Sequence, residues 1–87
     1  MHAVVVEVEI HDQEEARKGL EEGVLPMIKA TPGFVAGYWI RVGDGHGTSV
    51  VVFESKDQAL AGAPKQGENG PGVTFTRVTD GEVLASA

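Results

Sequence analysis

The feature that constrains the fold most is a strict alternation of side chains over Ala3–Ile10. Every second position is a branched aliphatic residue, and the positions between them include two carboxylates, Glu7 and Glu9. Successive side chains of a strand point to opposite faces, so this pattern predicts a β-strand with one wholly apolar face. The apolar face consists of Val4, Val6, Val8 and Ile10.

A helix is expected to follow this strand and to cover its apolar face. Asp12 and Glu15 have the spacing of a capping box, which marks a helix start. Apolar residues then recur at helical spacing along one stripe. Pro26 lacks the amide hydrogen that an α-helix needs, so it should kink or loosen the helix before Pro32 and Gly33 end it. The stripe consists of Ala16, Leu20, Val24, Met27 and Ile28.

The middle of the chain predicts a β-hairpin formed by Phe34–Val42 and Thr48–Glu54. The dipeptide Asp44-Gly45 between them is a strong signal for a two-residue turn. Such a turn fixes which side chains share a face, and a slip of one residue would reverse the assignment. It predicts a helix-facing set of Phe34, Ala36, Tyr38, Ile40, Ser49, Val51 and Phe53, and an opposite set of Trp39, Arg41, Thr48, Val50 and Val52.

The last third of the chain predicts a short helix, a loop and a final strand. Ser55 can cap a helix over residues 56–61, and a flexible loop rich in glycine and proline spans Gly67–Gly72. Val73–Leu84 is expected to be a strand with a bulge or bend at Asp80 and Gly81. The order βαββαβ predicts a single ferredoxin-like α+β domain over residues 1–87. Its four-stranded antiparallel sheet has the order 4-1-3-2 and both helices on one face.

Composition limits the classes of partner. The chain of 87 residues has a formal net charge of −6 and no run of basic residues, which argues against nucleic acid as a partner. It has no cysteine, and its longest apolar run is far too short to span a bilayer. We therefore expect no membrane association and a cytoplasmic location. A domain this small gains from a second subunit, so a homodimer is expected.

The segments Pro32-Gly33-Phe34, Gly37-Tyr38-Trp39 and Val51-Val52-Phe53-Glu54-Ser55 resemble the antibiotic biosynthesis monooxygenase superfamily. The resemblance extends over nearly the whole chain. It implies a dimeric α+β barrel, in which two sheets meet face to face with the helices outside. One branch of the superfamily oxidises polyphenols with O₂ without a metal or flavin, so no cofactor is implied.

The haem-degrading branch of the superfamily is disfavoured by three departures from its pattern. That branch uses an Asn on the first strand, a Trp at the end of the third strand and a His on the second helix. Here the first strand contains no Asn, the third-strand position is Phe53, and no His follows His46.

Candidate site residues follow from the predicted faces and from the resemblance. Tyr38, Phe34 and Phe53 are expected to contact a small aromatic ligand in the cleft between sheet and helices, and Trp39, Val50 and Val52 to form the dimer interface. The protein is expected either to oxygenate or to bind such a molecule. The alternative is a non-catalytic ligand-binding or structural dimeric module.

The remaining ionisable residues have simpler explanations. Glu7 and Glu9 could act as an acid and base pair, but Arg77 on the last strand should lie opposite one of them as a cross-strand ion pair. The three histidines, His2, His11 and His46, lack the close helical spacing of zinc ligands, so no metal site is predicted. No residue is assigned a catalytic role.

Overall fold

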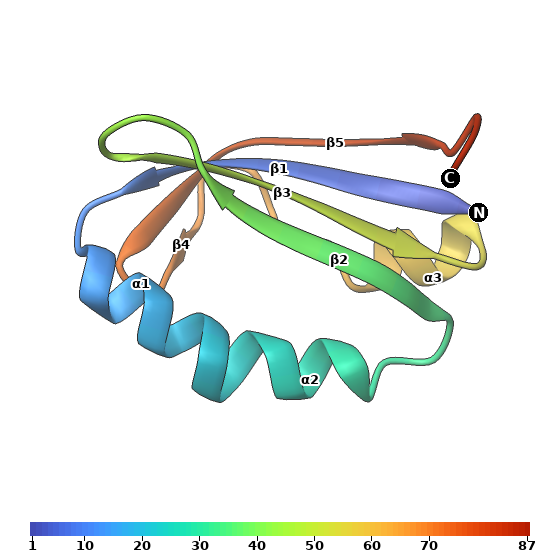
Figure 1. Ribbon diagram of the computed structural model, residues 1–87, viewed down its shortest axis with the longest axis horizontal. Coiled ribbons are helices and arrows are strands. Elements are labelled where there is room, and N and C mark those ends of the chain that lie inside the picture. The colour runs from blue at the N-terminus through green and yellow to red at the C-terminus, as the bar shows by residue number, and fades with distance from the viewer.

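The computed structural model describes residues 1–87 and consists of one curled antiparallel sheet with helices on one face (Figure 1). The strand order in the sheet is β2-β3-β1-β5-β4. In chain order the elements are β1 (His2–Ile10), α1 (Gln13–Gly19), η1 (Leu20–Val24), α2 (Leu25–Lys29), β2 (Phe34–Arg41), β3 (His46–Phe53), α3 (Lys56–Ala61), β4 (Asn69–Gly70) and β5 (Val73–Glu82).

The sheet confirms the predicted α+β class and adds one strand to the expected four. The long strands follow the expected ferredoxin-like order, with β5 in the place of the fourth strand. The fifth strand, β4, lies in the segment predicted as a loop. Asn69 pairs with Thr74 and Gly70 with Val73 across a turn at Pro71 and Gly72. Gly72 has a φ of 68°, the left-handed conformation that glycine adopts without strain.

The first helical region is one continuous helix with a π-helical segment in its middle. Its start is capped as predicted, because the side chain of Asp12 accepts a hydrogen bond from the amide of Glu15 at 3.0 Å. Within η1 the amide of Leu25 reaches back to the carbonyl of Leu20, five residues earlier. This wider turn lies directly before Pro26, so the loosening predicted at that proline is confirmed.

The register of the β2–β3 hairpin differs by one residue from the prediction. Trp39 lies opposite Ser49 and Tyr38 opposite Val50. The loop contains three residues instead of two, since Val42 donates a hydrogen bond to the carbonyl of His46 across Gly43–Gly45. Both flanking glycines of that loop have positive φ, which lets the longer loop close.

The slipped register reverses the predicted faces along most of β2. Trp39 shares the helix-facing side with Ser49, and Tyr38 shares the outer side with Val50. Phe34 nevertheless stays on the helix-facing side opposite Phe53, because a bulge between Phe34 and Ala36 inserts one extra residue. The face prediction is therefore wrong for Tyr38 and Trp39 and right for Phe34.

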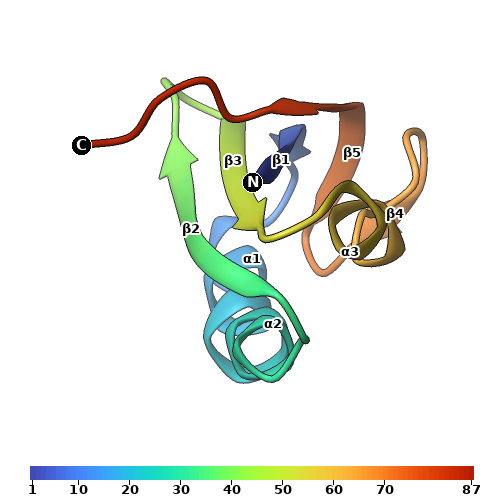
Figure 2. The same ribbon diagram turned by 90° about the vertical axis from the view of Figure 1, so that its right-hand side faces the viewer.

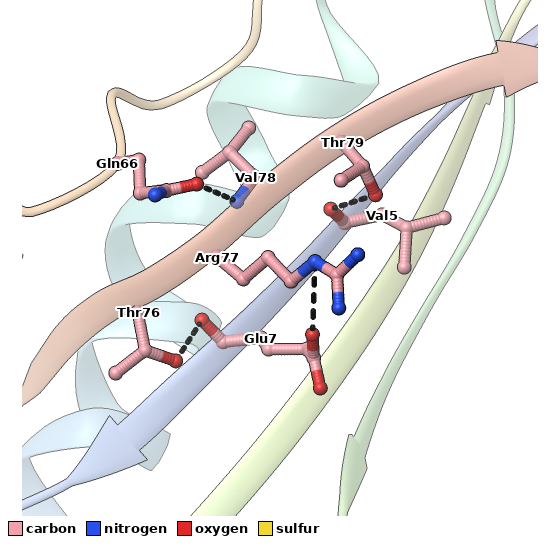
Figure 3. Close-up of polar contacts among 7 residues, drawn as sticks. All are labelled: Val5, Glu7, Gln66, Thr76, Arg77, Val78 and Thr79. Atoms are coloured by element: carbon pink, nitrogen blue, oxygen red, sulfur yellow. Dashed lines mark hydrogen bonds and ion pairs between the residues drawn. The ribbon is translucent and has the colours of Figure 1, made fainter.

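The last strand also carries its irregularity at a different place. The register of β1 with β5 shifts between Glu7 and Val8, where Thr76 is the extra residue, whereas Asp80 and Gly81 pair regularly. The predicted bulge at Asp80 and Gly81 is wrong. Figure 3 shows how this stretch is tied to its neighbours: Thr76 Oγ1 donates to the carbonyl of Glu7 at 3.0 Å, and the amide of Val78 donates to Gln66 Oε1 at 3.1 Å.

The core is small and lies between the sheet and the helices. Phe53 is its largest fully buried side chain and meets the Phe34 ring edge-on, with ring centroids 6.3 Å apart. The short helix α3, capped by Ser55 as predicted, contributes the fully buried Ala59. The buried apolar residues are Val4, Val6, Ile28, Val51, Phe53 and Ala59.

Candidate functional site

A large apolar cavity separates the helix-facing side of the sheet from the long helix. Its volume is about 530 Å³, which falls within the range of about 300–1,000 Å³ typical of small-molecule sites. All four long strands contribute to its wall. The apolar residues of the wall are Val4, Val6, Val8, Ile10, Ala16, Leu20, Val24, Met27, Ile28, Trp39, Val51, Phe53, Ala63, Val73 and Phe75, and Ile40 of the edge strand β2 also borders the space.

The cavity exists because the long helix does not close onto the sheet. Neither α1 nor η1 contributes a buried residue, and α2 contributes only Ile28. The apolar stripe predicted for this helix faces the sheet as expected, and Ala16, Leu20 and Val24 all line the cavity. Figure 2 shows the helix running beneath β2 and β3, while α3 lies beneath β5. The stripe therefore borders an open space instead of packed side chains.

Trp39 and Ser49 place two hydrogen-bonding groups in the wall, beside the polar side chains of Gln13, Arg17, Arg41 and Thr48. Trp39 and Ser49 are cross-strand neighbours on the helix-facing side, and Ser49 is only 8% exposed. Neither the Ser49 hydroxyl nor the Trp39 indole N–H takes part in a hydrogen bond within the chain. Both groups can therefore bond to a molecule that occupies the cavity.

Gly37 allows the Trp39 ring to lie where it does. A Cβ atom placed on Gly37 would be 2.8 Å from the outer carbons of the indole, closer than side chains approach one another. Gly37 and Trp39 are two residues apart and therefore lie on the same face of β2, where the indole ring covers the glycine. A glycine at this position is needed for the aromatic wall of the cavity.

Two of the three predicted ligand residues are in contact, and one of the three lines the cavity. Phe53 lines the cavity. Phe34 packs against Phe53 but lies behind the wall. Tyr38 is on the outer side of the sheet and is 66% exposed. Its predicted place in the cleft is wrong, because the register of the hairpin differs by one residue from the prediction.

The three predicted interface residues are likewise divided. Val50 and Val52 lie on the outer side of the sheet, as expected. Trp39 was expected beside them, but it packs against the buried cluster and lines the cavity. Its placement on the outer side is wrong, and Tyr38 lies there instead.

A second, polar pocket shares part of its wall with the cavity. Its residues come from the end of the sheet where β1 and β2 finish and α1 begins, and Figure 1 shows that these chain segments lie at the same end. Its volume is about 240 Å³. The two spaces share three wall residues, namely Ile10, Gln13 and Arg41. His11, Asp44 and Gly45 complete the polar pocket. Sequence reasoning did not identify Arg41 as a site residue, although its spacing of two from Trp39 places both on one strand face.

Two further groups of polar residues have structural roles. Arg77 was expected opposite one of the two carboxylates of β1, and it lies opposite Glu7, with Nε 3.8 Å from Glu7 Oε2 on the outer side of the sheet (Figure 3). Both side chains are more than half exposed, so the pair contributes at most about 1 kcal/mol. Thr74 donates its hydroxyl proton to Asn69 and therefore accepts a hydrogen bond from His11 Nε2 at 2.7 Å. This arrangement fastens the start of α1 to the β4–β5 turn.

No helix combines the length and the apolar character needed to cross a membrane. No group of three or more His, Cys, Asp or Glu side chains is placed to hold a metal ion. Comparison of the chain with protein-family models, with curated proteins and with solved structures gives no match.

Proposed function

We propose that this protein binds a small, largely apolar aromatic molecule in the cavity between its sheet and its long helix. The observation that carries the proposal is the cavity of about 530 Å³, which is apolar along the strands and the helix and has Ser49 as its buried polar residue. Trp39, Phe53 and Phe75 offer aromatic surfaces to a flat ring.

Binding is supported more directly than oxygenation. Oxidising a phenol with O₂ requires a group that accepts the hydroxyl proton. The ionisable side chains of the cavity wall are Arg17 and Arg41, whose guanidinium groups are hydrogen-bond donors and have no acceptor atom. That the chain belongs to the antibiotic biosynthesis monooxygenase superfamily and shares its cofactor-free chemistry remains a prediction. The ferredoxin-like strand order is compatible with that prediction.

A neutral environment-sensitive dye tests the binding proposal. N-phenyl-1-naphthylamine fluoresces more strongly in apolar surroundings, and we expect saturable enhancement by the wild-type chain. Ala16→Phe places a ring inside the cavity from α1, so it should weaken dye binding at least tenfold while the far-UV circular dichroism spectrum stays unchanged.

The matched control is Ala61→Phe, which adds the same ring at an exposed position of α3 outside the cavity wall. This variant should bind the dye like the wild type. Absence of saturable binding by the wild type, or equal weakening by both substitutions, would overturn the proposal.

We also propose that a second copy of this chain covers the outer side of the sheet. The long helix and α3 both lie on the other side, so no helix of the chain covers this face (Figure 2). Tyr38 and Ile40 are 66% and 50% exposed there. The side chains that share this face by register are Ala3, Val5, Ala36, Tyr38, Ile40, Val50 and Val52.

The charges beside this apolar patch suit a copy related by a two-fold axis. Glu7 and Arg77 lie side by side on the same face, so the edge of the patch has one negative and one positive charge. Two copies related by a two-fold axis can therefore pair these patches with opposite charges facing each other. An apolar patch of this kind is typical of an interface between subunits.

Light scattering coupled to size exclusion measures the oligomeric state. The expected mass is twice the 9.1 kDa of one chain, and Val50→Glu should shift it to that of one chain by placing a charge in the patch. Ala61→Glu on α3 should leave the mass unchanged. A wild-type mass of one chain at micromolar concentration would contradict this proposal.

A further inference from the structure

We infer that the molecule held in the cavity carries a carboxylate, and that Arg41 binds it. This inference rests on the binding function proposed above and specifies the chemical class of the ligand. The chain contains three arginines, and two of them are engaged: Arg17 Nη1 lies 3.3 Å from Glu21 and Arg77 Nε lies 3.8 Å from Glu7.

Arg41 has no carboxylate within ion-pair distance. It is the last residue of β2, and the slipped register puts it on the helix-facing side opposite Gly47. Gly47 offers no side chain to Arg41, and the apolar side chains of Val8 and Ile10 cover it instead, 3.0 and 3.4 Å from where a Cβ would lie. Arg41 therefore lies on the same side of the sheet as the cavity, and its side chain is exposed there.

The position of Arg41 explains why its partner should be part of a ligand. It lines both the apolar cavity and the polar pocket beside it, together with Gln13. A molecule with its ring against Trp39 can therefore extend its polar end to Arg41 without leaving the walls of the two spaces. The guanidinium matches a carboxylate with two parallel hydrogen bonds, and the Gln13 amide can donate a further one.

The other charged group of the polar pocket opposes this binding and makes the proposal specific. Asp44 lies in the wall of the same pocket, and His11 is held at Nε2 by Thr74. The whole chain has a net charge of −6, so it repels anions in general. A preference for an anionic ligand over a neutral one must therefore come from the local guanidinium.

A matched pair of probes tests this inference separately from the binding proposal. Isothermal titration calorimetry measures the Kd of 2-naphthoate and of its neutral analogue 2-naphthamide, which has the same ring and nearly the same shape. We expect the wild type to bind the naphthoate about tenfold more tightly, a typical size for a hydrogen-bonded charged pair. This preference should fall at high salt, because the pocket is open to solvent.

Three variants complete the test. Arg41→Gln should abolish the preference while binding of the naphthamide stays within twofold. Asp44→Asn should strengthen naphthoate binding by about twofold to fivefold, because it removes a like charge from the same pocket. Arg77→Gln on the outer face is the control and should leave both affinities unchanged.

The outcomes distinguish the two proposals. If neither probe binds, the binding function itself is overturned. If both probes bind equally, or if Arg41→Gln keeps the preference for the naphthoate, the cavity binds apolar rings and the carboxylate inference is wrong.

Discussion

Replacing Trp39 by alanine tests the hairpin register on which the whole site depends. The indole packs against the buried cluster on the helix-facing side, but its free side borders the cavity. Complete burial would make the loss of a large aromatic side chain cost about 3–5 kcal/mol. Because atoms contact only part of this ring, we expect a loss of about 2–3 kcal/mol in the free energy of unfolding. For a domain of this size that corresponds to a fall of roughly 10–20 °C in Tm.

Urea unfolding followed by far-UV circular dichroism measures this loss without relying on the tryptophan. The matched variant is Tyr38→Ala, one residue earlier on the outer face and 66% exposed. It should change the free energy of unfolding of the monomer by less than about 0.5 kcal/mol. The subunit association proposed above would add stability that depends on protein concentration, so both variants are compared at the lowest concentration of a dilution series. A larger loss for Tyr38→Ala than for Trp39→Ala at that concentration would refute the register.

Three other substitutions, one of them a control, probe the backbone that positions the long helix. Gly72→Ala should lower the free energy of unfolding by about 2–4 kcal/mol in urea titrations, because φ is 68° and the new Cβ would lie 2.4 Å from the Asp12 carbonyl oxygen. Gly67 has a φ of 89° and open space around it, so Gly67→Ala should lower the free energy of unfolding by only about 1 kcal/mol. Equal losses of unfolding free energy for Gly72→Ala and Gly67→Ala would show that the contact with Asp12 is unimportant. Asp12→Ala removes the cap of α1 and should cost about 1 kcal/mol in thermal unfolding, and no change would contradict that cap.

Local sequence patterns determined the identity of the elements. The alternation over β1, the caps at Asp12 and Ser55, and the loosening before Pro26 each depend on residues close together in the chain. Such features follow from backbone geometry and neighbouring hydrogen bonds, and they need no knowledge of distant contacts. The pairing of Arg77 with Glu7 was also accessible, because strand order and strand direction limit the possible partners.

The tertiary structure alone decided which side chains line the site. A hairpin with a two-residue turn and one with a three-residue turn differ by one position, and alternation of side chains is compatible with both. Packing against the core selected the register that turns Trp39 inward over Gly37, and the bulge after Phe34 then kept that ring inside as well. The cavity could not be read from the sequence either, because the distance between helix and sheet depends on side chains from all the long strands at once.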